Sequence, residues 1–180
     1  NYVSEATIFQ SNWCKFFNKK YGLKSQKYET VILNSATKVK LKNKKKIKGK
    51  IKIVASSWSS NWNKGFGFFL WLDRNLDFKN YELTFIGNSP VSFDNIKIIS
   101  PQKSKELHKK LKKYDIYLSA SKKDACSNSI LEAIACGLPV IAFDDGGNPE
   151  IIKGCGELYS SRKDFILKLK KLITNYKRYR

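Results

Sequence analysis

The sequence lacks several features that mark common functional classes. It has no methionine, one histidine, and no apolar stretch approaching the roughly 18 residues of a membrane-spanning helix. It has no GxGxxG or GxxxxGK[ST] motif, which argues against a dinucleotide oxidoreductase and a P-loop NTPase. Because an initiator methionine and a signal-peptide pattern are both missing, we expect a piece of a longer protein.

Metal-binding patterns are equally scarce. The four cysteines show no CxxC or Cys/His spacing, so we interpret them as reduced thiols packed like small apolar side chains. No Asp-x-Asp motif occurs, and nothing near the adjacent Asp144 and Asp145 completes a cation site. We therefore expect neither a metal nor a cofactor.

The charge is strongly one-sided, at +20, and lysine supplies most of it. Such a charge is compatible with a nucleic-acid partner, an anionic membrane, an anionic substrate, or a lysine-rich composition without any binding role. Nine lysines fall within residues 38–52. Like charges at this density repel one another into solvent, so we interpret residues 38–50 as a linker between two units, 1–37 and 51–180.

The larger unit, 51–180, alternates apolar runs typical of buried strands with helical patterns. We expect strands at 51–55, 83–87, 96–99, 116–118 and 140–143. We expect helices at 64–76, from Ser104 onward, at 130–136 and around Phe165–Tyr176. This alternation predicts an α/β fold with a doubly wound, Rossmann-like parallel sheet.

Ligands of such sheets bind at the carboxyl ends of the strands. The loops expected to converge there are 56–64, 87–90, 100–103, 119–128 and 144–149. The helix at 130–136 is apolar on nearly every side, so we expect it to be covered all round.

The smaller unit, 1–37, has the pattern strand, helix, strand. The strands are predicted at 6–9 and 29–33. Ser11 or Asn12 is a suitable N-cap for a helix reaching about Tyr21, with Trp13, Phe16 and Phe17 on one face.

One ordered motif dominates the sequence. Asp124 is followed after seven residues by Glu132, then by Ala133, Gly137, Pro139-Val140, the pair Gly146-Gly147, and Glu150. This order resembles the signature of the retaining GT-B glycosyltransferases, also called group 1 or family four. The first carboxylate of that signature is more often Glu, so Asp124 is a mild departure. The resemblance implies that 51–180 is the C-terminal, donor-binding half of a GT-B fold and that 1–37 is the end of the N-terminal domain.

The resemblance also assigns roles to the two carboxylates. Glu132 would accept hydrogen bonds from the ribose hydroxyls of a donor nucleotide, and Asp124 would contact hydroxyls of the donor sugar. From spacing alone, Ser129 and Glu132 also fit a helix-capping box, and Asp124 fits a surface aspartate paired with Lys122 or Lys123.

Further residues would surround the donor diphosphate. Ser127, Asn128 and Ser129 lead into a helix whose free N–H groups favour an anion, and one of them is needed as a cap in any case. Lys64 would neutralise charge on the diphosphate. Gly146 and Gly147 would lie beside the donor or simply form a tight turn.

Three other positions are an acidic residue after the glycine pair, the single histidine, and a tryptophan in the loop before Lys64. Glu150 is interpreted as a cap of the short helix that follows it, and the single histidine, His108, as solvated. Position 58 is tryptophan where most of the family carries arginine.

The phrase around Trp58 offers hydroxyls in place of the missing charge. Ser57, Ser59 and Ser60 offer hydroxyl donors to phosphate, and Ser57, Trp58 and Ser59 join the candidate donor site. The alternative for Trp58 and Trp62 is packing within the loop.

The implied activity is a hexosyltransferase-type transfer from a nucleotide-sugar to an acceptor hydroxyl, retaining and metal-independent. The acceptor would be a glycan, a lipid-linked molecule or a small molecule, without a nucleic-acid partner. A cytoplasmic location is expected, with lysine-mediated contact to the inner face of an anionic membrane as an option.

We expect this piece alone to bind donor weakly and to transfer nothing. The alternatives are a basic nucleic-acid or membrane-binding module and a non-transferring nucleotide-sugar binder or epimerase of the same fold.

Overall fold

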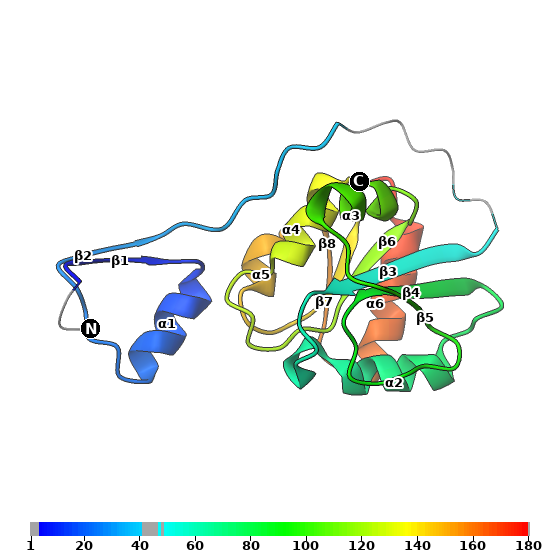
Figure 1. Cartoon of the computed structure of the whole chain (residues 1–180), viewed down its shortest axis with the longest axis horizontal. Helices are drawn as coiled ribbons and strands as arrows, with labels where there is room; N and C mark the ends of the chain where they lie inside the picture. Colours follow the sequence, from blue (N-terminus) through cyan, green and yellow to red (C-terminus); the bar gives the residue numbers. More distant parts are fainter. Residues whose placement is uncertain (1–3, 41–46, 48, 180) are drawn as a thin grey trace.

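The computed structural model describes residues 4–40, 47 and 49–179. The linker predicted at 38–50 therefore lies partly outside the described residues, because 41–46 and 48 are not among them. The N-terminal unit contains β1 (Ala6–Phe9), α1 (Asn12–Lys20) and β2 (Tyr28–Val31), and β1 pairs with β2 in parallel. Figure 1 shows this unit beside the larger one, with α1 facing α5.

The larger unit is built on one parallel sheet of six strands. Its strands are β3 (Ile51–Ser57), β4 (Tyr81–Gly87), β5 (Lys97–Ile99), β6 (Ile116–Ser119), β7 (Val140–Phe143) and β8 (Gly156–Tyr159). Their order across the sheet is β5-β4-β3-β6-β7-β8. The order in which strands are added therefore reverses between β3 and β6, while all strands remain parallel. The predicted α/β, Rossmann-like sheet is confirmed.

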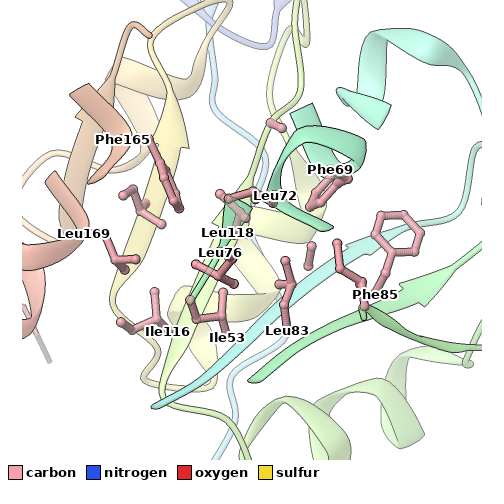
Figure 2. Packing of buried hydrophobic residues seen from close by; sticks show 14 of the residues in the cluster. Ile53, Phe69, Leu72, Leu76, Leu83, Phe85, Ile116, Leu118, Phe165 and Leu169 are labelled. Carbon is pink, nitrogen blue, oxygen red and sulfur yellow. The ribbon is translucent and has the colours of Figure 1, made fainter. Parts of the chain in front are cut away.

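Helices cover both faces of the sheet, as a parallel sheet requires. They are α2 (Phe66–Asn75), α3 (Ser104–Leu111), α4 (Asn128–Ala135), α5 (Asn148–Ile151) and α6 (Arg162–Thr174), with a 3-10 turn η1 (Trp62–Lys64) before α2. Figure 2 shows Phe69 and Leu72 of α2, with Phe165 of α6, packed over the strands on one face. The opposite face packs against α3, α4 and α5.

One strand was not predicted, and two expectations about local structure were wrong. β8 was missed because its four residues include Gly156 and Glu157 and show no continuous apolar run. α4 is not covered all round, since Leu131 and Ile134 are only half-buried. Phe16 does not share the packed face of α1; it is 69% exposed, while Trp13 and Phe17 stack on each other.

Glu150 joins the two units. Its Oε2 accepts hydrogen bonds from the backbone N and the side-chain Nδ2 of Asn12, at 2.9 and 2.8 Å, and its Oε1 accepts from the backbone N of Trp13 at 2.8 Å. Glu150 therefore caps α1, across 138 residues, and not the short helix α5 in which it lies. Burial opposes ionisation of Glu150, but these hydrogen bonds outweigh it and lower its pKa.

Within α1, the backbone amides of Asn12 and Trp13 donate directly to the carboxylate of Glu150. Because the folded pKa of Glu150 is lowered, the contact is fully present above the ordinary glutamate pKa and is lost as pH falls through the folded pKa. We predict that Glu150→Ala at pH 7 raises amide hydrogen exchange at Asn12 and Trp13 by about tenfold, since a charge-assisted hydrogen bond contributes about 1.5–3 kcal/mol.

The matched control is Glu106→Ala, which removes an exposed carboxylate paired only with Lys109 in α3. It should leave exchange at Asn12 and Trp13 unchanged. Equal exchange in both variants would contradict a role for Glu150 in holding α1.

Candidate functional site

A cavity of about 580 Å³ opens at the carboxyl ends of β3 and β6. This is the point at which the strand order reverses, where ligands of doubly wound sheets bind. Its walls are the end of β3, η1, the end of β4, the start of α3, and the segment from the β6 loop into α4. It is lined by Ser56, Ser57, Trp58, Ser59, Lys64, Ile86, Gly87, Pro101, Gln102, Lys103, Ser104, Leu107, Asp124, Cys126, Ser127, Asn128, Ser129 and Glu132.

An ion pair spans the cavity from one side of the strand reversal to the other. Lys64, at the end of η1, places Nζ 2.8 Å from Oδ2 of Asp124 in the loop after β6. The side chains are 29% and 16% exposed, so both still reach solvent. The partner of Asp124 is thus Lys64, and not the neighbouring Lys122 or Lys123 that the sequence offered.

Gly146 and Gly147 do not line this cavity. They lie against the backbone of the loop that carries Asp124, and the N–H of Gly147 donates to the carbonyl of Asp124 at 2.8 Å. A Cβ at Gly146 would lie 2.5 Å from the carbonyl oxygen of Asp124, and one at Gly147 would lie 2.1 Å from that of Ala125. The glycines therefore permit a close backbone approach that holds Asp124 in position.

The N-terminus of α4 faces the cavity without a side-chain cap. Ser127 is the N-cap residue, but its hydroxyl lies 3.0 Å from that of Ser129 and makes no capping hydrogen bond. Asn128 accepts instead from the side chain of Asn34, at 2.8 Å. The first-turn N–H groups and the positive end of the helix dipole are therefore presented to the cavity, which suits an anion.

Glu132 is not part of a capping box, because α4 begins at Asn128 and Ser129 lies inside it. Its Oε1 accepts a hydrogen bond from Ser104 at 3.2 Å and lies 3.7 Å from Nε2 of His108. The interpretation of His108 as solvated is therefore wrong: its side chain is only 12% exposed. Ser104 and His108 of α3 together orient the carboxylate of Glu132.

A buried tyrosine, Tyr117, connects two of the central strands. Tyr117 of β6 is 1% exposed, and its hydroxyl contacts Ser56, donating to the carbonyl of that residue at 3.2 Å. Burial raises the pKa of Tyr117, and the negative charge of Glu132 adds to the effect. Tyr117 therefore stays neutral at neutral pH and links β6 to the end of β3 at Ser56, which lines the cavity.

The loop after β3 carries exposed rings and hydroxyls that are already bonded. Trp58 and Trp62 are 71% and 58% exposed, so packing within the loop does not explain them. The hydroxyl of Ser57 donates to the carbonyl of Ser59 at 2.7 Å, and the hydroxyl of Ser59 accepts from the backbone N of Asn61. Among the described residues, no arginine lines this cavity, and its cations are Lys64 and Lys103.

The sequence did not predict that residues from 101–107 line the cavity. The loop at 100–103 was expected at the carboxyl ends of the strands, but none of its residues was chosen as a candidate. Gln102, Lys103 and Ser104 line the cavity, and the signal was available: a Ser-Pro turn after a strand, followed by a helix start.

The described residues offer neither a cluster of metal ligands nor a membrane-spanning helix. No group of three or more His, Cys, Asp or Glu side chains within 4–40, 47 and 49–179 is arranged to hold a metal ion. In the same residues, no helix has the length and apolar character needed to cross a bilayer.

Comparison with known families matches residues 37–180 to the family described as Glycosyl transferases group 1. No curated protein matches the sequence. Several solved structures share its fold. Sucrose-phosphate synthase from Thermosynechococcus elongatus has a TM-score of 0.78 at 14% identity, covering 98% of this chain and 51% of that one. The pneumococcal O-GlcNAc transferase GtfA, in complex with UDP and GlcNAc, has a TM-score of 0.63 at 16% identity, covering 97% and 39%.

A third structure is itself a single domain. The C-terminal domain of the group 1 family protein LpcC from Francisella tularensis has a TM-score of 0.56 at 27% identity, covering 74% of this chain and 81% of that one. The chain thus spans about half or less of the two longer proteins and most of the isolated C-terminal domain.

The glycine contacts generate a stability prediction. Gly147 has φ −83°, which any residue adopts, so Gly147→Ala adds no backbone strain. Its Cβ would lie 2.1 Å from the carbonyl oxygen of Ala125 and 3.1 Å from Oγ of Ser11. We expect Gly147→Ala to lower the free energy of unfolding by about 1–3 kcal/mol, measured by urea denaturation. Gly67→Ala is the control, because a Cβ there meets nothing within 4 Å, and it should leave stability unchanged or raise it slightly. Equal stability in the two variants would argue against the tight contact.

Proposed function

The chain belongs to the group 1 glycosyl transferases, and from this premise we propose that residues 51–180 bind the nucleotide-sugar donor of a sugar-transfer reaction. The sugar passes to an acceptor hydroxyl with retention of anomeric configuration and without a metal ion. Residues 1–37 belong to the N-terminal domain, and 38–50 link the two. The acceptor is a glycan, a lipid-linked molecule or a small molecule, and the lysines allow peripheral contact with an anionic membrane.

One observation carries this proposal. A single cavity at the strand reversal is lined by a lysine, an uncapped helix N-terminus and two carboxylates at separate positions. A nucleotide-sugar has matching parts: a diphosphate between two groups that are rich in hydroxyls. In this arrangement the diphosphate lies at the N-terminus of α4 and near Lys64, with the sugar toward Asp124 and the ribose toward Glu132.

The cationic groups account for the chemistry. As the glycosidic bond breaks, negative charge grows on the departing diphosphate. Lys64 and the first-turn N–H groups of α4 stabilise that charge because they are held in place before the reaction begins. Glu132 binds the donor through ribose hydroxyls, and Ser104 and His108 keep it oriented. Gly146 and Gly147 act indirectly, by holding the loop of Asp124.

Donor binding must also alter the Lys64–Asp124 pair. Without donor, the two charges neutralise each other at 2.8 Å. A diphosphate offers Lys64 a second anionic partner, and Asp124 then becomes available to sugar hydroxyls. In the free protein the ion pair avoids the free-energy cost of an unpaired, partly buried charge at either residue.

We predict that substitutions at the two members of the pair differ in their effect on nucleotide affinity, measured by calorimetry with UDP, GDP and ADP. At least one of these nucleotides should bind the 180-residue chain. Lys64→Gln should weaken that binding by about tenfold or more, because a charge-assisted contact to phosphate is lost. Asp124→Asn should leave the affinity unchanged or raise it, because Lys64 is released for the diphosphate.

Lys153→Gln is the matched control, since it removes one exposed lysine far from the lining of the cavity. It should not change the affinity. Absence of binding by every nucleotide, with the fold intact by circular dichroism, would sink the proposal. So would a Lys64→Gln variant that binds as tightly as the unaltered chain.

A further inference from the structure

A second cavity, of about 530 Å³, lies at the same edge of the sheet. It is bordered by η1, the first turn of α2, the loop after β6, and the ends of β7 and β8. It thus lies on the side of the sheet covered by α2 and α6, whereas the first cavity reaches toward α3 and α4. Two short segments contribute to both cavities: η1 supplies Lys64 to the first and Trp62 to the second, and the β6 loop supplies Asp124 and Lys122.

Aromatic rings form much of the wall of this second cavity. Trp62 is 58% exposed, and Phe68 and Phe143 are half-buried. Trp62 meets the ring of Phe66 edge-on, with ring centroids 6.2 Å apart, so part of the indole is packed while the rest is accessible from the cavity. The apolar C–H face of a sugar ring packs well on such aromatic faces, while its hydroxyl groups remain available to polar neighbours.

Two cations border the cavity without a counter-charge. Lys122 lies over the ring of Phe143, with Nζ 5.3 Å from the centroid, and the guanidinium of Arg162 lies 5.5 Å from the ring centroid of Trp71. Within the described part of the chain, neither forms an ion pair, and no carboxylate lines the cavity. The N-terminus of α6 is already capped by Ser161, so the two side chains are what would hold an anion.

Gly67 supplies an independent observation. It lies in the first turn of α2 and lines the cavity, and a Cβ at this position would meet nothing within 4 Å. Its neighbour Gly65 differs, because φ is +86° and a Cβ would lie 2.4 Å from the carbonyl oxygen of Ala120. Glycine inside a helix costs about 1 kcal/mol relative to alanine. Neither backbone conformation nor packing requires glycine at 67, and the lack of a side chain there leaves that part of the cavity free.

We propose that this second cavity binds an anionic saccharide, a sugar carrying a carboxylate or a phosphate, as part of the acceptor site. The aromatic residues receive the sugar rings, and Lys122 and Arg162 pair with the acidic group. This rests on the proposed function for its biological meaning, because the shared walls of η1 and the β6 loop put the saccharide next to the donor. Binding of the saccharide itself depends only on the second cavity.

Titration of the chain with trigalacturonic acid, maltotriose, glucose 6-phosphate and inorganic phosphate, followed by NMR at about 0.15 M salt, tests this. We expect trigalacturonic acid or glucose 6-phosphate to bind at least tenfold more tightly than neutral maltotriose, and the stronger of the two identifies the acidic group. The double substitution Lys122→Gln with Arg162→Gln should abolish the preference. Gly67→Leu should block both kinds of saccharide by filling the cavity. Lys163→Gln, an exposed cation beside Arg162 that does not line the cavity, should have no effect.

Three results would overturn the proposal: equal affinity for acidic and neutral saccharides, unchanged binding in a folded Gly67→Leu variant, or phosphate alone binding as tightly as the acidic sugars. If Gly67→Leu fails to fold, Gly67→Ala and the double substitution still decide the question. Binding of the nucleoside diphosphate that the chain prefers in calorimetry should remain unchanged in the same variants. If the unaltered chain binds none of UDP, GDP and ADP, that result counts against the donor site alone. If it binds a nucleotide but no saccharide, that result counts against the second cavity alone.

Discussion

The pairing of β3 with β6 at the centre of the sheet is the constraint on which the rest of the larger unit depends. From these two strands the chain builds outward in opposite directions, through β4 and β5 on one side and through β7 and β8 on the other. The loops that leave β3 and β6 must therefore diverge, and a cavity opens where they part. The Lys64–Asp124 ion pair crosses this opening and so connects the two sides of the point at which the strand order reverses.

Much of this arrangement could be predicted from the sequence. β6 and β7 were recognisable as short, nearly continuous apolar runs, as strands buried on both faces are. β3 and β4 were recognisable because apolar residues dominate their buried segments, despite Lys52 and Glu82. The ordered motif from Asp124 to Glu150 identified the carboxylates, and every candidate site residue except Gly146 and Gly147 lines the first cavity. Contacts between distant segments were not predictable. Glu150 with α1 and His108 with Glu132 depend on the path of the chain in space, which local patterns do not encode.

The two cavities divide the chemistry between two sides of one edge. The first carries the groups suited to a diphosphate and its flanking hydroxyls. The second carries aromatic rings and two cations that form no ion pair with the described residues. Because η1 and the β6 loop contribute to both, a displacement of either loop would alter donor and acceptor contacts together. Gly65, Gly146 and Gly147 hold these loops against their neighbours at distances that no side chain would allow.

The central claim is that the N-terminus of α4 and Lys64 receive a diphosphate. The most direct test follows the backbone amides of the ¹⁵N-labelled chain by NMR during titration with the nucleoside diphosphate that binds most tightly in calorimetry. This account predicts the largest shift changes at Asn128, Ser129 and Lys64, with smaller changes at Glu132 and the loop after β3. Shifts confined to other surfaces, such as the exposed lysines of α6, would contradict it.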